Sequence, residues 1–260
     1  MKRFFRDIKK YRWYLLYAAR SELRAEVAGS YLNWLWWVLE PLCYMLVYSF
    51  VVRVVFSSKE EYFAAFVLIG LTGWNFFNKS VQGSVGLIRR NKSVVSKIYL
   101  PKYILVLTNM LVLGFKMLVS LALIFILMAI LHVPFTFHIL EVIPILAVLF
   151  IGTFAASLFF MHFGVFVRDL YQVTAVLLRL VFYMTGVFYS IPKRVPAPWG
   201  KFLVRANPMA CLVEALRSAL LYGKSPDWRV LGLWLLLSVL FAALGIYTVY
   251  RYENSYAKVI

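Results

Sequence analysis

Residues 103–131 read "YILVLTNMLVLGFKMLVSLALIFILMAIL", an apolar run with a single charged side chain, Lys116. A helix of about 20 residues crosses the roughly 30 Å hydrocarbon layer of a bilayer, so this run is long enough to span a membrane with some tilt. It lacks the strict polar and apolar alternation of a strand in a transmembrane barrel. The stretch therefore predicts a transmembrane helix.

The rest of the chain has the same character, since 63% of its residues are hydrophobic and only 15% are charged. Five further apolar runs are long enough to cross a bilayer as helices: residues 34–56, 62–85, 139–167, 170–189 and 230–250. We therefore predict an all-α polytopic membrane protein with six transmembrane helices in a single transmembrane domain, residues 1–260. Spans one to five fall within residues 34–189 in this interpretation.

The chain carries a net charge of +17, which in a soluble protein would suggest a nucleic-acid partner. In a membrane protein the same excess sets the orientation, because Lys and Arg collect in the cytoplasmic segments. Segments 1–33, 86–102, 168–169 and 251–260 hold most of the cations, so we expect both termini in the cytoplasm and no nucleic acid as a partner. Segment 190–229 is also basic, but long loops weigh less in this rule. Phospholipid headgroups are the expected partners of these cations.

Segment 1–33 has the pattern of a helix that lies on a membrane surface. Phe4, Ile8, Tyr11 and Leu15 recur at helical spacing, and basic residues surround them. This pattern predicts an interfacial helix on the inner leaflet, which leads into the first span.

Segment 190–229 is rich in proline and contains "NPMACLVEALRSALLYG", residues 207–223. Three of its residues mark the ends of a helix: Asn207 as the cap, Pro208 at the first position and Gly223 after the last turn. The helix is too short to cross a bilayer, so we predict an outer segment that is interfacial or re-entrant. Glu214 and Arg217 pair on it at i, i+3. A solvated surface loop that only packs is the alternative.

The sequence offers little that is typical of an enzyme. It has 11 acidic residues and 3 histidines, and no spacing among them resembles a metal site or a catalytic triad. We therefore predict no catalytic residue, no metal site and no cofactor bound by this chain. His162, alone within an apolar run, is interpreted as a packed or hydrogen-bonded side chain. Uphill transport by such a chain takes its energy from an ion gradient or a partner ATPase, and the spans hold few of the acids that an ion-driven carrier needs.

Four stretches, in chain order, carry a resemblance: "GSYLNWLWWVLEPLCYMLVYSFVVRVVF" from residue 29, "LIGLTGWNFFNKSVQGSVGLIRRNKSVVSKIYLPKYIL" from residue 68, "FVRDLYQVTAVLLRLVFYMTGVFYSIP" from residue 166 and "NPMACLVEALRSALLYG" from residue 207. Together they resemble the membrane subunit of ATP-binding-cassette exporters of cell-surface polysaccharides. That family exports O-antigen, capsule and wall teichoic acid chains. The resemblance covers nearly the whole chain.

The resemblance implies that the chain moves a polysaccharide linked to undecaprenyl diphosphate from the cytoplasmic to the outer face of a bacterial cytoplasmic membrane. It also implies a homodimer of six-span subunits with two cytoplasmic ATPase subunits, which bind the ATP and Mg. A related permease that exports a drug or another lipid is the alternative. One departure is "MTGVFY", residues 184–189, where many relatives have Ser-Pro. It leaves the shape of the outer end of the fifth span open.

Residues 88–102, "IRRNKSVVSKIYLPK", form a basic segment with apolar side chains at helical spacing. Given the resemblance, we expect a short amphipathic helix that sits in a groove of the ATPase. The expected coupling residues are Arg89, Arg90, Lys92, Val94, Val95, Ile98 and Tyr99, with a second contact at the turn formed by Arg168 and Asp169. An ordinary basic cytoplasmic loop is the alternative.

Charged and aromatic residues within the spans are the candidates for a substrate channel. A charge is costly there, and an arginine can bind phosphate through two hydrogen bonds. Aromatic faces can stack on sugar rings. The expected channel residues are Lys116, Arg179, Tyr44, Tyr48, Phe76, Phe77, Tyr183 and Phe188. The alternative is that the cations snorkel and the rings only pack. Glu40, near the start of the first span, is expected to pair with a basic residue nearby.

Overall fold

The computed structural model describes residues 2–29, 31–52, 60, 62–97 and 99–259. Every regular element among them is a helix, in this order: α1 (Lys2–Val27), η1 (Asn33–Leu35), α2 (Trp36–Phe50), α3 (Phe63–Val85), α4 (Leu87–Arg90), α5 (Lys92–Val95), α6 (Lys102–Ile130), η3 (Phe137–Glu141), α7 (Val142–Phe166), α8 (Leu170–Met184), α9 (Ile191–Arg194), α10 (Trp199–Ala206), α11 (Pro208–Leu220), α12 (Trp228–Arg251) and α13 (Glu253–Val259). The predicted all-α fold is confirmed.

Three helical segments among the described residues are long and apolar enough to cross a membrane: Lys102–Ile130, Phe137–Phe166 and Trp228–Arg251. A fourth apolar helix, α8, is shorter. These four coincide with predicted spans, and they identify a multi-pass membrane protein. At the other two predicted spans lie α2 and α3.

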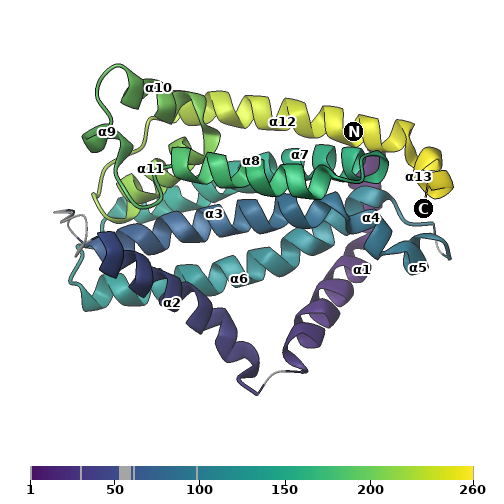
Figure 1. Cartoon of the computed structure of the whole chain (residues 1–260), viewed down its shortest axis with the longest axis horizontal. Coiled ribbons are helices and arrows are strands. Elements are labelled where there is room, and N and C mark those ends of the chain that lie inside the picture. The colour runs from purple at the N-terminus through teal and green to yellow at the C-terminus, as the bar shows by residue number, and fades with distance from the viewer. Residues whose placement is uncertain (1, 30, 53–59, 61, 98, 260) are drawn as a thin grey trace.

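The long helices run side by side, with α3 near the middle of the bundle (Figure 1). α3 packs against both α6 and α7, and α7 packs along α12. Nearly all side chains in the first half of α3, from Phe63 to Trp74, are buried. This half of α3 is therefore the centre around which the other helices assemble.

The two ends of the bundle differ. α9, α10 and α11 gather at one end, whereas α4, α5, α13 and both chain termini lie at the other (Figure 1). α1 packs against α6 and then diverges from the bundle to meet the start of α2, so that α1 and α2 form a V (Figure 1). Both termini thus share one end of the bundle with the basic segment after α3.

The helix predicted after Asn207 is present as α11. The Asn207 side chain accepts hydrogen bonds from the backbone N–H groups of Met209 and Ala210, at 3.0 and 3.4 Å. Pro208 is the first helical residue, and Gly223 lies beyond the end with a left-handed φ of +55°. Most side chains of α11 are buried and it packs against α3 and α7, so it is part of the bundle rather than a solvated loop.

The fifth predicted span ends as a helix at Met184, although the sequence there lacks the Ser-Pro of many relatives. The Thr185 hydroxyl donates to the carbonyl of Val181 at 2.7 Å. Gly186 then takes a φ of +68°, which a helix cannot continue through. The glycine therefore ends the helix without a proline.

The basic segment predicted as one helix is divided into α4 and α5. Between them stands Asn91, whose side chain donates to the carbonyl of Leu87 at 2.9 Å. Residues 99–101 are not helical. Ile98 lies outside the described residues.

Candidate functional site

A cavity of about 550 Å³ opens between α2, α3 and α8, and we call it the groove. Its lining combines aromatic, amide and charged side chains, among them Tyr44, Tyr48, Trp74, Tyr183, Asn75, Asn78, Gln82, Glu40, Lys79 and Arg179. A few polar groups among ring faces are typical of a ligand site that orients its ligand by hydrogen bonds.

Four of the predicted channel residues line the groove: Tyr44, Tyr48, Arg179 and Tyr183. A fifth, Phe188, contacts it through Tyr48, with the two ring centroids 4.3 Å apart. The structure thus brings together residues from α2, from α8 and from the turn after α8.

Two of the predicted channel aromatics lie elsewhere. Phe76 is only 3% exposed and stacks on Phe150 of α7 inside the bundle. Phe77 lines a separate apolar cavity of about 300 Å³, which Trp234 of α12 also lines. Neither ring lines the groove.

Lys116 faces α1. Its Nζ lies 2.5 Å from a carboxylate oxygen of Glu26. The Lys116 side chain also lines a cavity of about 50 Å³ beside the groove, together with Glu40 and Lys79. Lys116 is therefore next to the groove wall rather than in it.

A polar stripe on α3 faces the groove and was missed by the sequence analysis: Asn75, Asn78, Lys79 and Gln82. These residues recur at i, i+3, i+4 and i+7, which places them on one helix face, and this spacing is the signal that could have identified them. The Gln82 Nε2 donates to the carbonyl of Tyr171 at 3.0 Å, which fixes α3 against the start of α8.

The prediction that Glu40 pairs with a nearby cation is confirmed. The Nζ of Lys79 lies 2.7 Å from Oε1 of Glu40 and donates a hydrogen bond to it. The side chains are 43% and 44% exposed, respectively, so the pair is open to the groove that both residues line.

Arg217 on α11 is only 1% exposed, and Glu214 is the one partner that the sequence predicts for it. That carboxylate lies 3.8 Å away. The guanidinium also donates to the carbonyls of Phe66, Gly186 and Val187, at 3.3, 2.9 and 2.7 Å. It lies 3.4 Å from the centroid of the Phe66 ring. Arg217 therefore holds the turn at Gly186 and Val187. The next residue is Phe188, which contacts the groove through Tyr48.

Most of the predicted coupling residues lie on α4, α5 and at Tyr99, at the end of the bundle that holds the termini, and we call these segments the coupling surface (Figure 1). Arg89 and Arg90 of α4 are exposed. Arg89 donates to the carbonyl of Val165 at 2.8 Å, close to the end of α7. The exposed turn with Arg168 and Asp169 follows directly, so α4 lies close to the second predicted contact.

The predicted contact residues on α5 differ in how exposed their side chains are. Lys92 is exposed, whereas Val94 and Val95 are half-buried. Val95 packs partly against the core of the bundle. The apolar side of α5 is therefore shared between the bundle and the surface.

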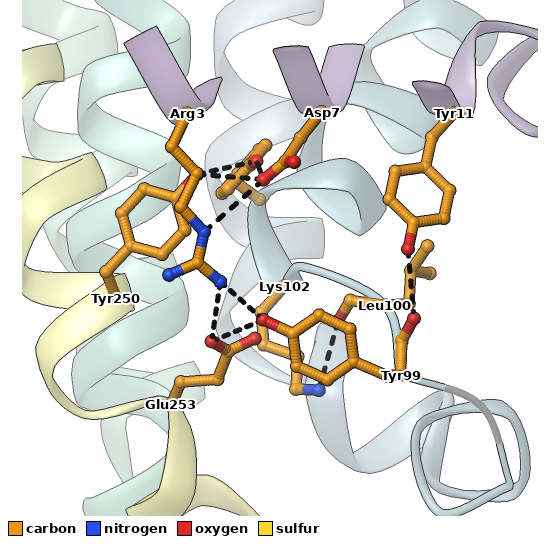
Figure 2. A network of polar contacts seen from close by, with 9 residues as sticks. Arg3, Asp7, Tyr11, Tyr99, Leu100, Lys102, Tyr250 and Glu253 are labelled. Atoms are coloured by element: carbon orange, nitrogen blue, oxygen red, sulfur yellow. Dashed lines mark hydrogen bonds and ion pairs between the residues drawn. The ribbon is translucent and has the colours of Figure 1, made fainter. Parts of the chain in front are cut away.

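Figure 2 shows a polar network around Tyr99, whose hydroxyl connects both ends of the chain. It accepts a hydrogen bond from Arg3 at 2.6 Å and donates one to Glu253 at 3.0 Å. Burial and the hydrogen bond to Glu253 raise the pKa of Tyr99, so the hydroxyl remains a protonated donor. The Tyr11 hydroxyl donates to the Tyr99 carbonyl at 3.2 Å.

The network continues inward through Asp7, which is 9% exposed (Figure 2). Its Oδ2 accepts hydrogen bonds from Tyr103 at 2.7 Å and Tyr250 at 3.1 Å. The Arg3 guanidinium lies 4.3 Å over the Tyr250 ring. α1 is thus attached to α6 and to α12, as well as to Tyr99.

His162 has a hydrogen-bonding partner in α13, since its Nδ1 lies 2.7 Å from the hydroxyl of Tyr256. The interpretation of His162 as a hydrogen-bonded residue is confirmed. Within the part of the chain that the structure describes, no group of three or more His, Cys, Asp and Glu side chains could hold a metal ion.

Comparison with known proteins gives a match over most of the chain. The profile of the ABC-2 type transporter family matches residues 15–221. The O-antigen export system permease protein RfbA of Myxococcus xanthus is 29% identical over 260 residues, covering 97% of this chain and 98% of that protein. One Klebsiella pneumoniae protein of the same description is 21% identical over 95% of this chain and 94% of its own length. Another is 24% identical over 80% of this chain and 80% of its own length. The chain therefore belongs to the ABC-2 type transporter family, as a membrane subunit.

Proposed function

We propose that the chain is the permease subunit of an ATP-driven exporter in a bacterial cytoplasmic membrane. Its substrate is an O-antigen, teichoic acid or capsule-like polysaccharide on undecaprenyl diphosphate, which moves from the cytoplasmic to the outer face. The groove carries this proposal, because it combines aromatic, amide and cationic groups in a chain similar to O-antigen export permeases over nearly its full length.

The lining of the groove suits both parts of such a substrate. The rings of Tyr44 and Tyr183 are 47% and 61% exposed, and apolar faces of sugars stack on such rings. The amides of the α3 stripe can exchange hydrogen bonds with sugar hydroxyls. The guanidinium of Arg179 can bind a phosphate through two hydrogen bonds. Many weak contacts and few strong ones let a long glycan pass without being retained.

The proposed topology has six spans: α2, α3, α6, the segment of η3 and α7, α8, and α12. α1 lies on the inner leaflet and α11 re-enters the membrane from the outer side. Both termini are cytoplasmic in this arrangement. The shared position of the termini, α4 and α5 at one end of the bundle supports it, because this end carries the basic segments (Figure 1).

A homodimer would enclose the groove. Large apolar side chains are exposed on α2 and α8, on either side of it: Val47 and Phe50 are 59% and 64% exposed, and Val176 and Leu180 are 60% and 57% exposed. A second copy packed on these faces would cover them and turn the open groove into a channel between the two subunits.

Two cytoplasmic ATPase subunits, which hold the ATP and Mg, would supply the energy. The contact is proposed at the coupling surface, through Val94, Val95 and the surrounding cations, with a second contact at Arg168 and Asp169. The network of Tyr99 supports this, because it attaches the coupling surface to α1, α6 and α12.

The apolar cavity of about 300 Å³ between α7, α11 and α12 favours the alternative, a permease for a drug or another lipid. The two functions differ in what stimulates ATP hydrolysis by the complex of this chain with its ATPase. The proposed function expects stimulation by undecaprenyl-diphosphate-linked glycan and none by apolar drugs. Stimulation by drugs alone would overturn it.

A further inference from the structure

The charges of the groove are unevenly paired. Its lining includes two cations, Lys79 and Arg179, and one acid, Glu40. Glu40 is bound to Lys79 at 2.7 Å. Arg179, on the opposite wall, makes no ion pair with any other described residue of the chain. Of the two cations that line the groove, one is thus neutralised by an acid of the chain and the other is not.

We propose that Glu40 is an internal counter-anion that occupies Lys79 while the groove is empty, and that the diphosphate of the substrate displaces it. The inference rests on the proposed function and adds a selectivity device to it. Lys79 and Arg179 together match the two ionised phosphate groups of a diphosphate diester. A phospholipid offers only one.

The position of the pair along the helices fits this role. Glu40 lies four residues after Trp36, the first residue of α2, and Lys79 lies six residues before Val85, the last of α3. At 1.5 Å per residue these offsets are about 6 and 9 Å, close to the level of the inner headgroups in the proposed topology. A lipid diphosphate that enters from the inner leaflet therefore meets Lys79 first.

Arg179 lies further along the same path. The hydrogen bond from Gln82 to the Tyr171 carbonyl sets the register of the antiparallel helices α3 and α8. Lys79 lies three residues from Gln82 along α3, toward the outer side. Arg179 lies eight residues from Tyr171 along α8, in the same direction. The axial separation of the two cations is thus about 7 to 8 Å. A diphosphate that binds Lys79 therefore has Arg179 as its second cation.

The exchange of one anion for another is feasible because the pair is partly exposed. Water screens such a Lys–Glu pair, so it contributes little net stability. A diphosphate replaces it with charge-assisted hydrogen bonds to both cations. A singly charged phospholipid phosphate gains less and does not displace Glu40. The acid therefore raises selectivity by disfavouring the wrong ligand.

The simpler reading is that the pair only joins α2 to α3. A second Lys–Glu pair serves as control at the other end of the bundle, where Nζ of Lys193 lies 2.6 Å from the carboxylate of Glu60, a side chain that is 8% exposed. Neither of these two residues lines the groove. Glu60→Gln therefore breaks a Lys–Glu pair of similar length and leaves the groove unchanged.

The experiment uses the complex of the full chain with its ATPase in nanodiscs of phosphatidylethanolamine. Stimulation of ATP hydrolysis is titrated with undecaprenyl diphosphate. Undecaprenol, which has the lipid tail alone, and inorganic pyrophosphate, which has the phosphates alone, are titrated separately to show which part of the lipid stimulates hydrolysis. For Glu40→Gln we expect the half-saturating concentration of undecaprenyl diphosphate to fall about three- to fivefold, the order of one partly exposed ion pair. Added phosphatidylglycerol should now compete. Glu60→Gln should behave as the wild type does.

A second variant shows whether Glu40 acts through Lys79. Lys79→Met should raise the half-saturating concentration, and in this background Glu40→Gln should give no gain. The inference alone would be overturned if Glu40→Gln still lowered the half-saturating concentration in the absence of Lys79. It would also be overturned if the Glu40→Gln complex assembled normally and responded as the wild type does. A wild-type complex that ignores undecaprenyl diphosphate and its glycan conjugates would overturn the proposed function as well.

Discussion

The hydroxyl of Tyr99 donates a hydrogen bond of 3.0 Å to the carboxylate of Glu253, which joins the coupling surface to the C-terminal helix. The same hydroxyl accepts a bond from Arg3 at the N-terminal end. Tyr99 was expected to enter an ATPase groove, and its side chain is 60% exposed. Its hydroxyl is nevertheless engaged within the chain, so it is suited to pass a displacement of the coupling surface to α1 and α13.

Tyr99→Phe should uncouple the ATPase without releasing it. The ring stays, but the bonds to Arg3 and Glu253 are lost, at a cost of about 0.5–1.5 kcal/mol for partly exposed groups. We expect substrate-stimulated ATP hydrolysis to fall by about two- to twelvefold, the fold-change that corresponds to that cost, while co-purification of the ATPase is retained. The control is Tyr17→Phe, because Tyr17 of α1 is 76% exposed. Wild-type stimulation in Tyr99→Phe would contradict this role.

Val94→Asp combined with Val95→Asp should release the ATPase. Both side chains are half-buried on α5, and two unpaired charges in a desolvated contact cost about 2–5 kcal/mol. Co-purification of the ATPase and surface display of glycan, measured in the same cells, should both be lost. Ser21→Asp adds a charge at an exposed position of α1, outside the coupling surface, and should be tolerated. If binding and display survive the double substitution, α4 and α5 are only a basic loop.

The sequence predicts best what is decided locally. The run at 103–131 became α6, because apolar length alone determines a spanning helix. The cap at Asn207 was readable for the same reason, since its partners lie two and three residues away. The division of the basic segment at Asn91 was missed although it is also local, since the Asn91 side chain donates to the carbonyl of Leu87 only four residues earlier.

The groove was predicted in part. Tyr44 and Tyr48, like Arg179 and Tyr183, are four residues apart and share a helix face, so each pair lines the groove together. Phe76 lies three residues before Lys79, so helical spacing did not separate it from the α3 stripe, and only its packing on Phe150 places the ring inside the bundle. The role of Arg217 was beyond reach, because its acceptors are backbone carbonyls of distant segments, which carry no signal in the sequence.

Gly70→Ala should destabilise the protein because it disturbs Arg217. A Cβ at this position would lie 2.8 Å from Nη2 of Arg217 and 3.1 Å from the Val187 carbonyl oxygen. The guanidinium is held by three carbonyls and has little freedom to move away, so we expect a loss of about 1–3 kcal/mol. Gly73→Ala, one turn along, meets no atom closer than 3.7 Å and should be tolerated. Thermal unfolding in detergent compares the two, and equal midpoints would contradict the role of Arg217 as a fixed clamp.

Arg179→Ala should weaken the response to substrate more than Lys116→Ala does. Arg179 lines the groove, whereas Lys116 lies behind its wall and is paired with Glu26. Loss of a charge-assisted phosphate contact should raise the half-saturating concentration of lipid-linked glycan about tenfold. For Lys116→Ala we expect a smaller increase.

Assembly with the ATPase should be normal in both of these variants. Arg194→Ala, which removes an exposed cation of α9 away from the groove, is the control. Responses identical to the wild type in both variants would assign these cations a structural role only.

The most direct test reconstitutes this chain with its ATPase in sealed vesicles and follows undecaprenyl-diphosphate-linked glycan by its accessibility to a glycan-binding lectin added outside. The predicted result is ATP-dependent appearance of the glycan on the face opposite to the ATPase, with neither transport nor ATP hydrolysis by this chain alone. ATP hydrolysis by the lone chain, or glycan that never crosses while the complex hydrolyses ATP, would contradict the account.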